Sequence, residues 1–297
     1  MNAAHFMTLY TTETRKLYRR LSSMIGLALC AAFGLIGPLG ARLVNWGVVA
    51  PITEAKEANE AAGNPGDMGL TMDPTMLGAD EAIAAAFGFR GFFFLPILIF
   101  IMAGLSFAAE HANRSIREYA LRPVPRPALI MSRWLALTTW VFTAVLFTFV
   151  LSMGIGLILV GPMEEWNAAL MQLGNALVVD WAFATLALSV AVFTRSIAAT
   201  IAILILTFVL QLGLSMVLSI LANESLQGVA VQMLPEQLTF VEKTFWIAEY
   251  LVVAQPPLLW GSCIPGSTEW QGYVTLFVVA FSALIGALIR FQRMDLP

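Results

Sequence analysis

Six apolar runs, each long enough to cross a lipid bilayer, alternate with polar segments along the chain. They cover residues 21–44, 91–109, 134–160, 170–193, 197–222 and 272–289. A membrane-spanning helix needs about 20 predominantly apolar residues, and its backbone groups must be hydrogen-bonded within the helix. The pattern therefore predicts an all-α polytopic membrane protein with six transmembrane helices.

Basic residues collect in the segments on one side of these runs. Of the 16 lysines and arginines, 12 lie there, namely Arg15, Lys16, Arg19, Arg20, Arg114, Arg117, Arg122, Arg126, Arg133, Arg195, Arg290 and Arg293. Cytoplasmic loops carry an excess of Lys and Arg. The distribution predicts that both termini are cytoplasmic.

Two long segments are then expected on the outer side. Residues 45–90 form an acidic outer loop, whose Ala-rich stretches favour short helices. Residues 223–271 form an amphipathic segment, interrupted by Glu242, Lys243 and Glu249. It either lies on the outer membrane surface or forms a packed external cap.

The N-terminal arm, residues 1–20, has apolar and basic residues at helical spacing. Phe6, Leu9 and Leu17 alternate with Arg15 and Arg19. This pattern predicts an interfacial helix whose basic side chains face anionic headgroups. A simple cytoplasmic extension of the first span is the alternative.

Composition agrees with a membrane protein. Charged residues make up 12% of the chain and hydrophobic residues 59%, with a mean hydropathy of +0.80. Soluble domains have roughly 25% charged residues. Cys30 lies in an apolar run and Cys263 in a polar one, so we expect no disulfide between them.

The most informative segment is the basic linker between the second and third runs, residues 110–133. Residues 113–120 have the length of about two helical turns. Pro123 then forbids an ordinary helical continuation. The linker is either a stiff cytoplasmic docking element or a basic loop that only fixes orientation.

This linker resembles the cytoplasmic loop of ABC-2 type transporter permeases. Glu110, Ser115 and the run Leu121-Arg122-Pro123-Val124-Pro125-Arg126 carry the resemblance. The turn at residues 193–199 and the tail at residues 290–296 are also similar to the family. The chain departs from the family in having Arg114-Ser115 where a Gly-Thr pair is usual.

The resemblance implies a single permease domain over residues 1–297, with a coupling helix between spans two and three. It implies that the linker docks on a cytosolic ABC ATPase. The residues expected at this contact are Glu110, Asn113, Arg114, Ser115, Ile116, Arg117, Glu118, Leu121, Pro123 and Arg126.

The resemblance also implies an exporter in the inner membrane of a prokaryote. It would work as a homodimer or heterodimer with a second permease copy, among membrane lipids. An envelope or periplasmic protein on the outer loops is a further candidate partner, and no nucleic acid is expected.

ATP hydrolysis requires a phosphate-binding loop that ends in Gly-Lys-Ser/Thr. Lys16, Lys56 and Lys243 follow Arg15, Ala55 and Glu242, so none belongs to such a loop. We therefore expect no enzyme activity and no cofactor or metal site in this chain, with ATP and Mg on the partner subunit.

Polar residues inside the spans are the candidate pathway contacts. They are Thr207, Gln211 and Ser215 in the fifth run and Asp180 in the fourth. A carboxylate in a membrane is costly, so Asp180 should face protein or water. It contributes either to a pathway or to a structural hydrogen bond, with Asn175 and Thr185 as candidate supporters. In the first run, Gly34, Gly37 and Gly40 are expected to permit close helix packing.

A rival hypothesis keeps the fold but not the transport. The chain would then be a non-transporting membrane scaffold or regulator of an envelope complex, with its long outer loop holding a partner.

Overall fold

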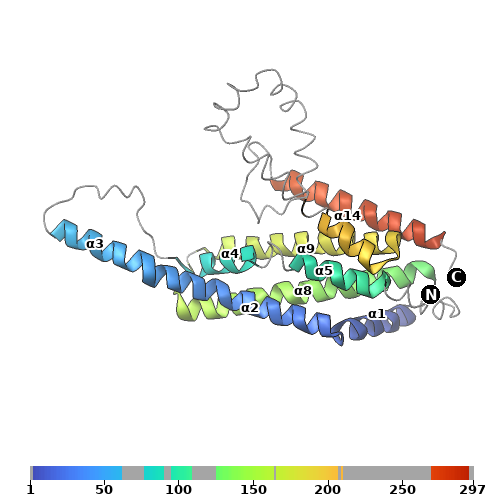
Figure 1. Cartoon of the computed structure of the whole chain (residues 1–297), viewed down its shortest axis with the longest axis horizontal. Helices are drawn as coiled ribbons and strands as arrows, with labels where there is room; N and C mark the ends of the chain where they lie inside the picture. Colours follow the sequence, from blue (N-terminus) through green and yellow to red (C-terminus); the bar gives the residue numbers. More distant parts are fainter. Residues whose placement is uncertain are drawn as a thin grey trace, which may run out of the picture.

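The computed structural model describes residues 3–61, 77–89, 95–108, 125–163, 165–206, 209 and 269–293. Within these residues all regular structure is helical, which confirms the all-α prediction (Figure 1). The labelled helices run roughly parallel to one long axis. Residues 207 and 208, 210–268 and the other gaps lie outside the described part, and so does the predicted amphipathic segment 223–271 except for residues 269–271, which begin the last helix.

Three of the described helices are long and apolar enough to cross a membrane. They are Leu21–Glu57, Arg126–Leu159 and Trp166–Thr194. Shorter apolar helices lie where spans two, five and six are predicted, at Leu95–Ala108, Ile197–Leu206 and Leu276–Gln292. The chain is therefore a multi-pass membrane protein, while the six-span count and the cytoplasmic termini stay predictions.

The first long helix continues well past the predicted span. Helix α2 (Leu21–Val44) has the predicted bounds, and it runs on through a π-helical turn, η1 (Asn45–Val49), into α3 (Ala50–Ala61). The apolar helix Leu21–Glu57 has 37 residues, or about 55 Å at 1.5 Å per residue. Since a hydrocarbon core is about 30 Å thick, α3 extends beyond it, and it projects from the bundle in Figure 1.

A short helix from the predicted outer loop packs inside the bundle. Helix α4 (Ala79–Phe89) lies against α2, α8 (Arg126–Leu159) and α9 (Trp166–Thr194). Ala79, Ala82, Ile83 and Ala86 are buried there. Their spacing of three and four residues gives α4 a smooth face, which suits close helix contact.

Helix α4 and the next helix, α5, pack one after the other against the same three helices. Helix α5 (Leu95–Ala103) and the π-helical turn η3 (Gly104–Ala108) continue the pass, and α5 contacts α2, α8 and α9 as α4 does. The second pass thus includes a stretch, residues 79–89, that the hydropathy pattern assigns to the outer loop.

Small residues of α2 set how closely these helices approach. A β-carbon at Gly37 would lie 2.7 Å from the β-carbon of Ala86 and 2.8 Å from its backbone nitrogen. At Gly26 it would lie 2.8 Å from the ring of Trp140. At Gly34 it would lie 3.0 Å from the β-carbon of Leu151 in α8, and at Gly40 it would have no described atom within 4 Å. Among the described residues the prediction of close packing is therefore right for Gly34 and Gly37 and wrong for Gly40.

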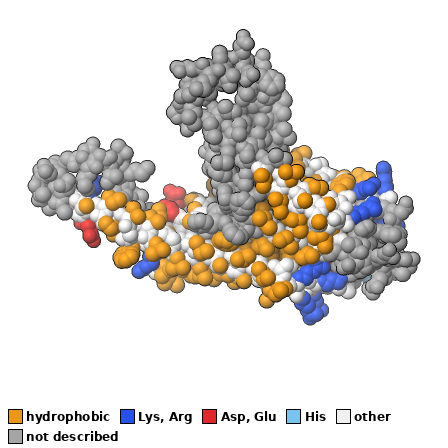
Figure 2. Space-filling view, in the orientation of Figure 1, with side chains coloured by type: hydrophobic (Ala, Val, Ile, Leu, Met, Phe, Trp, Pro, Cys, Tyr) orange, Lys and Arg blue, Asp and Glu red, His pale blue; other side chains and the backbone are white. Residues whose placement is uncertain are grey.

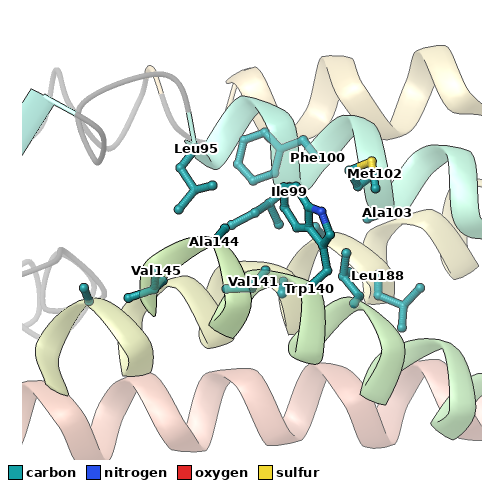
Figure 3. Close-up of a cluster of buried hydrophobic side chains, with 14 of the residues drawn as sticks. Leu95, Ile99, Phe100, Met102, Ala103, Trp140, Val141, Ala144, Val145 and Leu188 are labelled. Carbon is teal, nitrogen blue, oxygen red and sulfur yellow. The ribbon is translucent and has the colours of Figure 1, made fainter. Parts of the chain in front are cut away.

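The core is centred on Trp140 of α8, which is fully buried. Figure 3 shows it beside Ile99 and Phe100 of α5, Val141 of α8 and Leu188 of α9. Several hydroxyl groups in this core donate to backbone carbonyls, and Thr148 Oγ1 lies 3.0 Å from the Ala144 carbonyl oxygen in its own helix and 3.2 Å from that of Cys30 in α2. Such bonds satisfy these hydroxyl groups without water, which an apolar surrounding requires.

Gly37 and Gly40 offer a matched test of the packing. Gly37→Ala should destabilise the folded chain by about 1–3 kcal/mol, because the added methyl group meets the α4 backbone. Gly40→Ala, in the same helix, meets open space and should be neutral or slightly stabilising. Unfolding in mixed micelles titrated with SDS measures both, and equal effects of the two variants would refute the close contact between α2 and α4.

Candidate functional site

The predicted coupling loop, residues 110–133, is described only from Pro125 onward. Residues 109–124 lie outside the described part, and with them Glu110, Asn113, Arg114, Ser115, Ile116, Arg117, Glu118, Leu121 and Pro123. At the far end, Pro125 is the residue before α8 and Pro127 is its second residue. Proline suits the first helical turn, whose backbone N–H groups have no helical partner. The last eight residues of the predicted loop are thus helical, and α8 begins at Arg126 rather than near residue 134.

Both ends of the loop meet the C-terminal helix α14 (Glu269–Gln292). The guanidinium Nη1 of Arg126 donates a hydrogen bond to the Gln292 carbonyl oxygen at 3.0 Å. The Phe107 ring, in η3, lies 5.6 Å from the Phe291 ring at an interplanar angle of 77°. The end of α14 therefore lies beside the exit and the entry of the loop.

A buried ion pair lies next to this region. Arg133 Nε is 3.7 Å from Glu13 Oε2, and the two side chains are only 1% and 6% exposed. Lys16 Nζ donates to the same carboxylate at 3.0 Å. The Arg133 guanidinium also lies 5.5 Å from the centre of the Phe107 ring, within the range of a cation–π contact. Charges from α1 and α8 thus meet beside Phe107, three residues before the predicted loop.

The N-terminal helix α1 (Ala3–Tyr18) is docked on α8 by further polar contacts. The Tyr10 hydroxyl lies 2.8 Å from Thr139 Oγ1, and the Tyr18 hydroxyl lies 2.7 Å from Thr143 Oγ1. Both threonines donate to carbonyls of α8, so the tyrosines are the donors. Leu17 is buried in the main core. A bend at residues 19 and 20 separates α1 from α2, so α1 is a helix of its own.

The sequence interpretation missed the Glu13–Arg133 pair. The charge pattern assigns Arg133 only to the residues that set orientation, and it gives Glu13 no role. One signal was present, because Glu13 shares a helical face with the apolar residues Leu9 and Leu17 at spacings of four. An acidic residue on the apolar face of a basic helix indicates a buried cationic partner.

The candidate pathway residues are only partly described. Thr207, Gln211 and Ser215 lie outside the described residues. Asp180 is 4% exposed in α9. Thr185, a predicted supporter of Asp180, instead donates to the Trp181 carbonyl and accepts a hydrogen bond from Trp134 Nε1, each at 2.9 Å. The Thr185 hydroxyl proton is therefore bonded to the Trp181 carbonyl and not to Asp180.

Aromatic side chains surround this part of α9. The Trp181 ring lies 6.3 Å from Trp134 and 5.2 Å from Phe277 of α14. A groove between α9 and α14 is lined by apolar side chains, those of Val179, Ala182, Phe183, Leu186, Leu276 and Val279. These side chains offer no hydrogen-bonding group to a solute.

The basic side chains mark one end of the molecule. In Figure 2, Lys and Arg gather toward the end of the bundle where α1 begins and α14 ends, and hydrophobic side chains cover much of the surface between the two ends. The exposed apolar residues include Leu21, Met24 and Ile25 of α2 and Leu146, Val150 and Ile158 of α8. This distribution is expected of a protein whose sides face lipid and whose basic end faces the cytoplasm.

The Glu13–Arg133 pair should be essential for stability. Glu13→Gln removes the carboxylate charge beside a buried guanidinium and should destabilise the fold by roughly 3 kcal/mol. Lys16→Gln should cost less than about 1 kcal/mol, because the Lys16 side chain is 36% exposed. Thermal unfolding in detergent compares them.

The double variant Glu13→Leu with Arg133→Met provides the decisive control. Replacing both charged side chains by apolar ones leaves no unpaired charge in the interior. The double variant should therefore recover much of the stability lost in Glu13→Gln. Additive losses in the double variant would show that the two side chains do not act as a pair.

Comparison with known proteins agrees with these features. Residues 63–221 match the family model described as ABC-2 family transporter protein, and this range is over half of the 297 residues. The range contains the second pass, the predicted coupling loop, α8 and α9. No curated protein matches the chain.

Proposed function

We propose, because the chain belongs to the ABC-2 transporter family, that it is the membrane-spanning subunit of an ATP-driven exporter in a prokaryotic inner membrane. Two such subunits form a dimer, and two cytosolic ABC ATPases bind beneath it. ATP closes the ATPases, and the coupling loop passes the movement to the helices. The observation that carries the proposal is the family match across the loop and the helices on both sides of it.

The sequence supports placing ATP on another chain. Its three lysines, Lys16, Lys56 and Lys243, lie outside any phosphate-binding motif. Energy must then enter through a contact with the partner, and the basic loop is the segment that the family resemblance assigns to that contact. ATP and Mg would be bound entirely by the ATPase subunits.

The described helices suit a loop that transmits force. One end of the loop leads from η3 and the other leads into α8, a helix of 34 residues or about 50 Å. Helix α8 packs against α1, α2, α4 and α9 along its length. A displacement of its first turn is therefore carried to several helices at once, because packed helices transmit strain.

The loop should be required for binding the ATPase. Reversing the charges of neighbouring residues with Arg117→Glu and Glu118→Arg should lower the amount of ATPase that co-purifies at least about tenfold, because it inverts the charge pattern at the contact. Arg195→Glu, which changes a basic residue in the turn between α9 and the helix Ile197–Leu206, is the matched control and should retain the ATPase.

Two outcomes would change the proposal. Normal co-purification and ATPase turnover with the charge-reversed loop would remove the docking role of residues 110–133. An assembled, ATP-hydrolysing complex that moves no solute, when reconstituted in vesicles loaded with a cell extract, would favour the scaffold hypothesis over export.

A further inference from the structure

We infer that the last turn of α14 is a clasp that holds both ends of the coupling loop and positions it for the ATPase. The clasp consists of Phe107, Arg126, Phe291 and Gln292. The inference rests on the proposed function for the meaning of the loop, but the contacts themselves belong to this chain alone.

The first contact fixes the end at which the chain enters the loop. Phe107 is fully buried in η3, two residues before residue 109, and Phe291 is 1% exposed. Their rings meet at 5.6 Å and 77°, which is the edge-to-face geometry that aromatic pairs favour. The Arg133 guanidinium lies 5.5 Å from the same Phe107 ring. Phe107 is thus contacted from α8 and from α14.

The second contact fixes the end at which the chain leaves the loop. Arg126 is the first residue of α8, and its Nη1 donates to the Gln292 carbonyl at 3.0 Å. Gln292 is the last residue of α14, where backbone carbonyls lack a partner within the helix. A cation at this end is also favoured by the helix dipole, so Arg126 is well suited to bind there.

The two contacts fall on consecutive residues of one helix. Positions 107 and 126 are separated by the whole loop, yet one turn of α14 binds both. A loop whose ends are fixed samples fewer positions, so less conformational entropy is lost when it binds the ATPase. Phe291 and Arg126 therefore act as positioning residues.

Limited trypsin digestion of the purified, full-length permease tests the clasp without any ATPase. In Phe291→Ala we expect cleavage after Arg114 to become about tenfold faster than in the unsubstituted protein, because digestion follows the open population of a segment. Cleavage after Arg195, in a turn that the clasp does not touch, should stay unchanged. Phe281→Ala, on the same helix but facing Trp181 at 5.4 Å, is the matched control and should leave cleavage after Arg114 unaltered.

The two cleavage sites distinguish a local change in the loop from a loss of stability of the whole protein. Unchanged cleavage after Arg114 in a folded Phe291→Ala protein would overturn the clasp. If cleavage after Arg195 also rises, the variant has loosened as a whole, and Arg126→Ala, whose side chain is exposed, decides instead. A rise confined to Arg114 in that variant supports the clasp, and the lack of a rise overturns it.

A second measurement links the clasp to the ATPase. Titration of the permease with the cytosolic ATPase that co-purifies with it should give about tenfold weaker binding for Phe291→Ala than for Phe281→Ala. Faster digestion with unaltered ATPase binding would keep the clasp as a structural feature and remove its positioning role, whereas the docking role of the loop is tested by the charge-reversed variant Arg117→Glu with Glu118→Arg. The two failures are therefore distinguishable.

Discussion

The close approach of α2 to α4 and α8 determines how the rest of the chain is arranged. In lipid the hydrophobic effect does little to bring helices together, so association depends on packing at short range. Gly37 leaves room for the backbone of α4, and Gly26 leaves room for the ring of Trp140. A larger residue at either position would push α2 outward and open the core in which Trp140, Ile99 and Leu188 meet.

Hydroxyl groups and charged groups occupy different parts of the bundle. In the interior, hydroxyls such as those of Thr148 and Ser189 donate to carbonyls of their own helices, so they do not require a partner elsewhere. Charged contacts such as Glu13 with Arg133, and Arg126 with Gln292, lie instead where the coupling loop joins the bundle. The ends of the bundle helices next to the predicted coupling loop are thereby held in part by electrostatic contacts.

Hydropathy alone predicted the elements whose environment is uniform. The bounds of α2 agree with the run at residues 21–44, because that whole stretch is apolar. Hydropathy assigns α4 to an outer loop, because its first turn contains Asp80 and Glu81. The hydropathy pattern does not show that α4 packs against α2, α8 and α9. The pairing of Glu13 with Arg133 joins residues 120 positions apart, and only the tertiary fold brings them together. Gly40 follows Gly37 by three residues and lies near the same face of α2, yet a β-carbon at Gly40 would have no described atom within 4 Å, because the contact with α4 does not extend to that level.

Phe107 connects the two ends of the chain to the loop. Helix α1 reaches it through Glu13 and Arg133, and α14 reaches it through Phe291. A movement of the loop cannot displace Phe107 without disturbing a buried ion pair or a buried aromatic contact. Such contacts have discrete favourable geometries, so the region should shift between defined arrangements rather than deform gradually. Helices α1 and α14 are thus both linked to one residue close to the predicted coupling loop, although neither contributes residues to the loop itself.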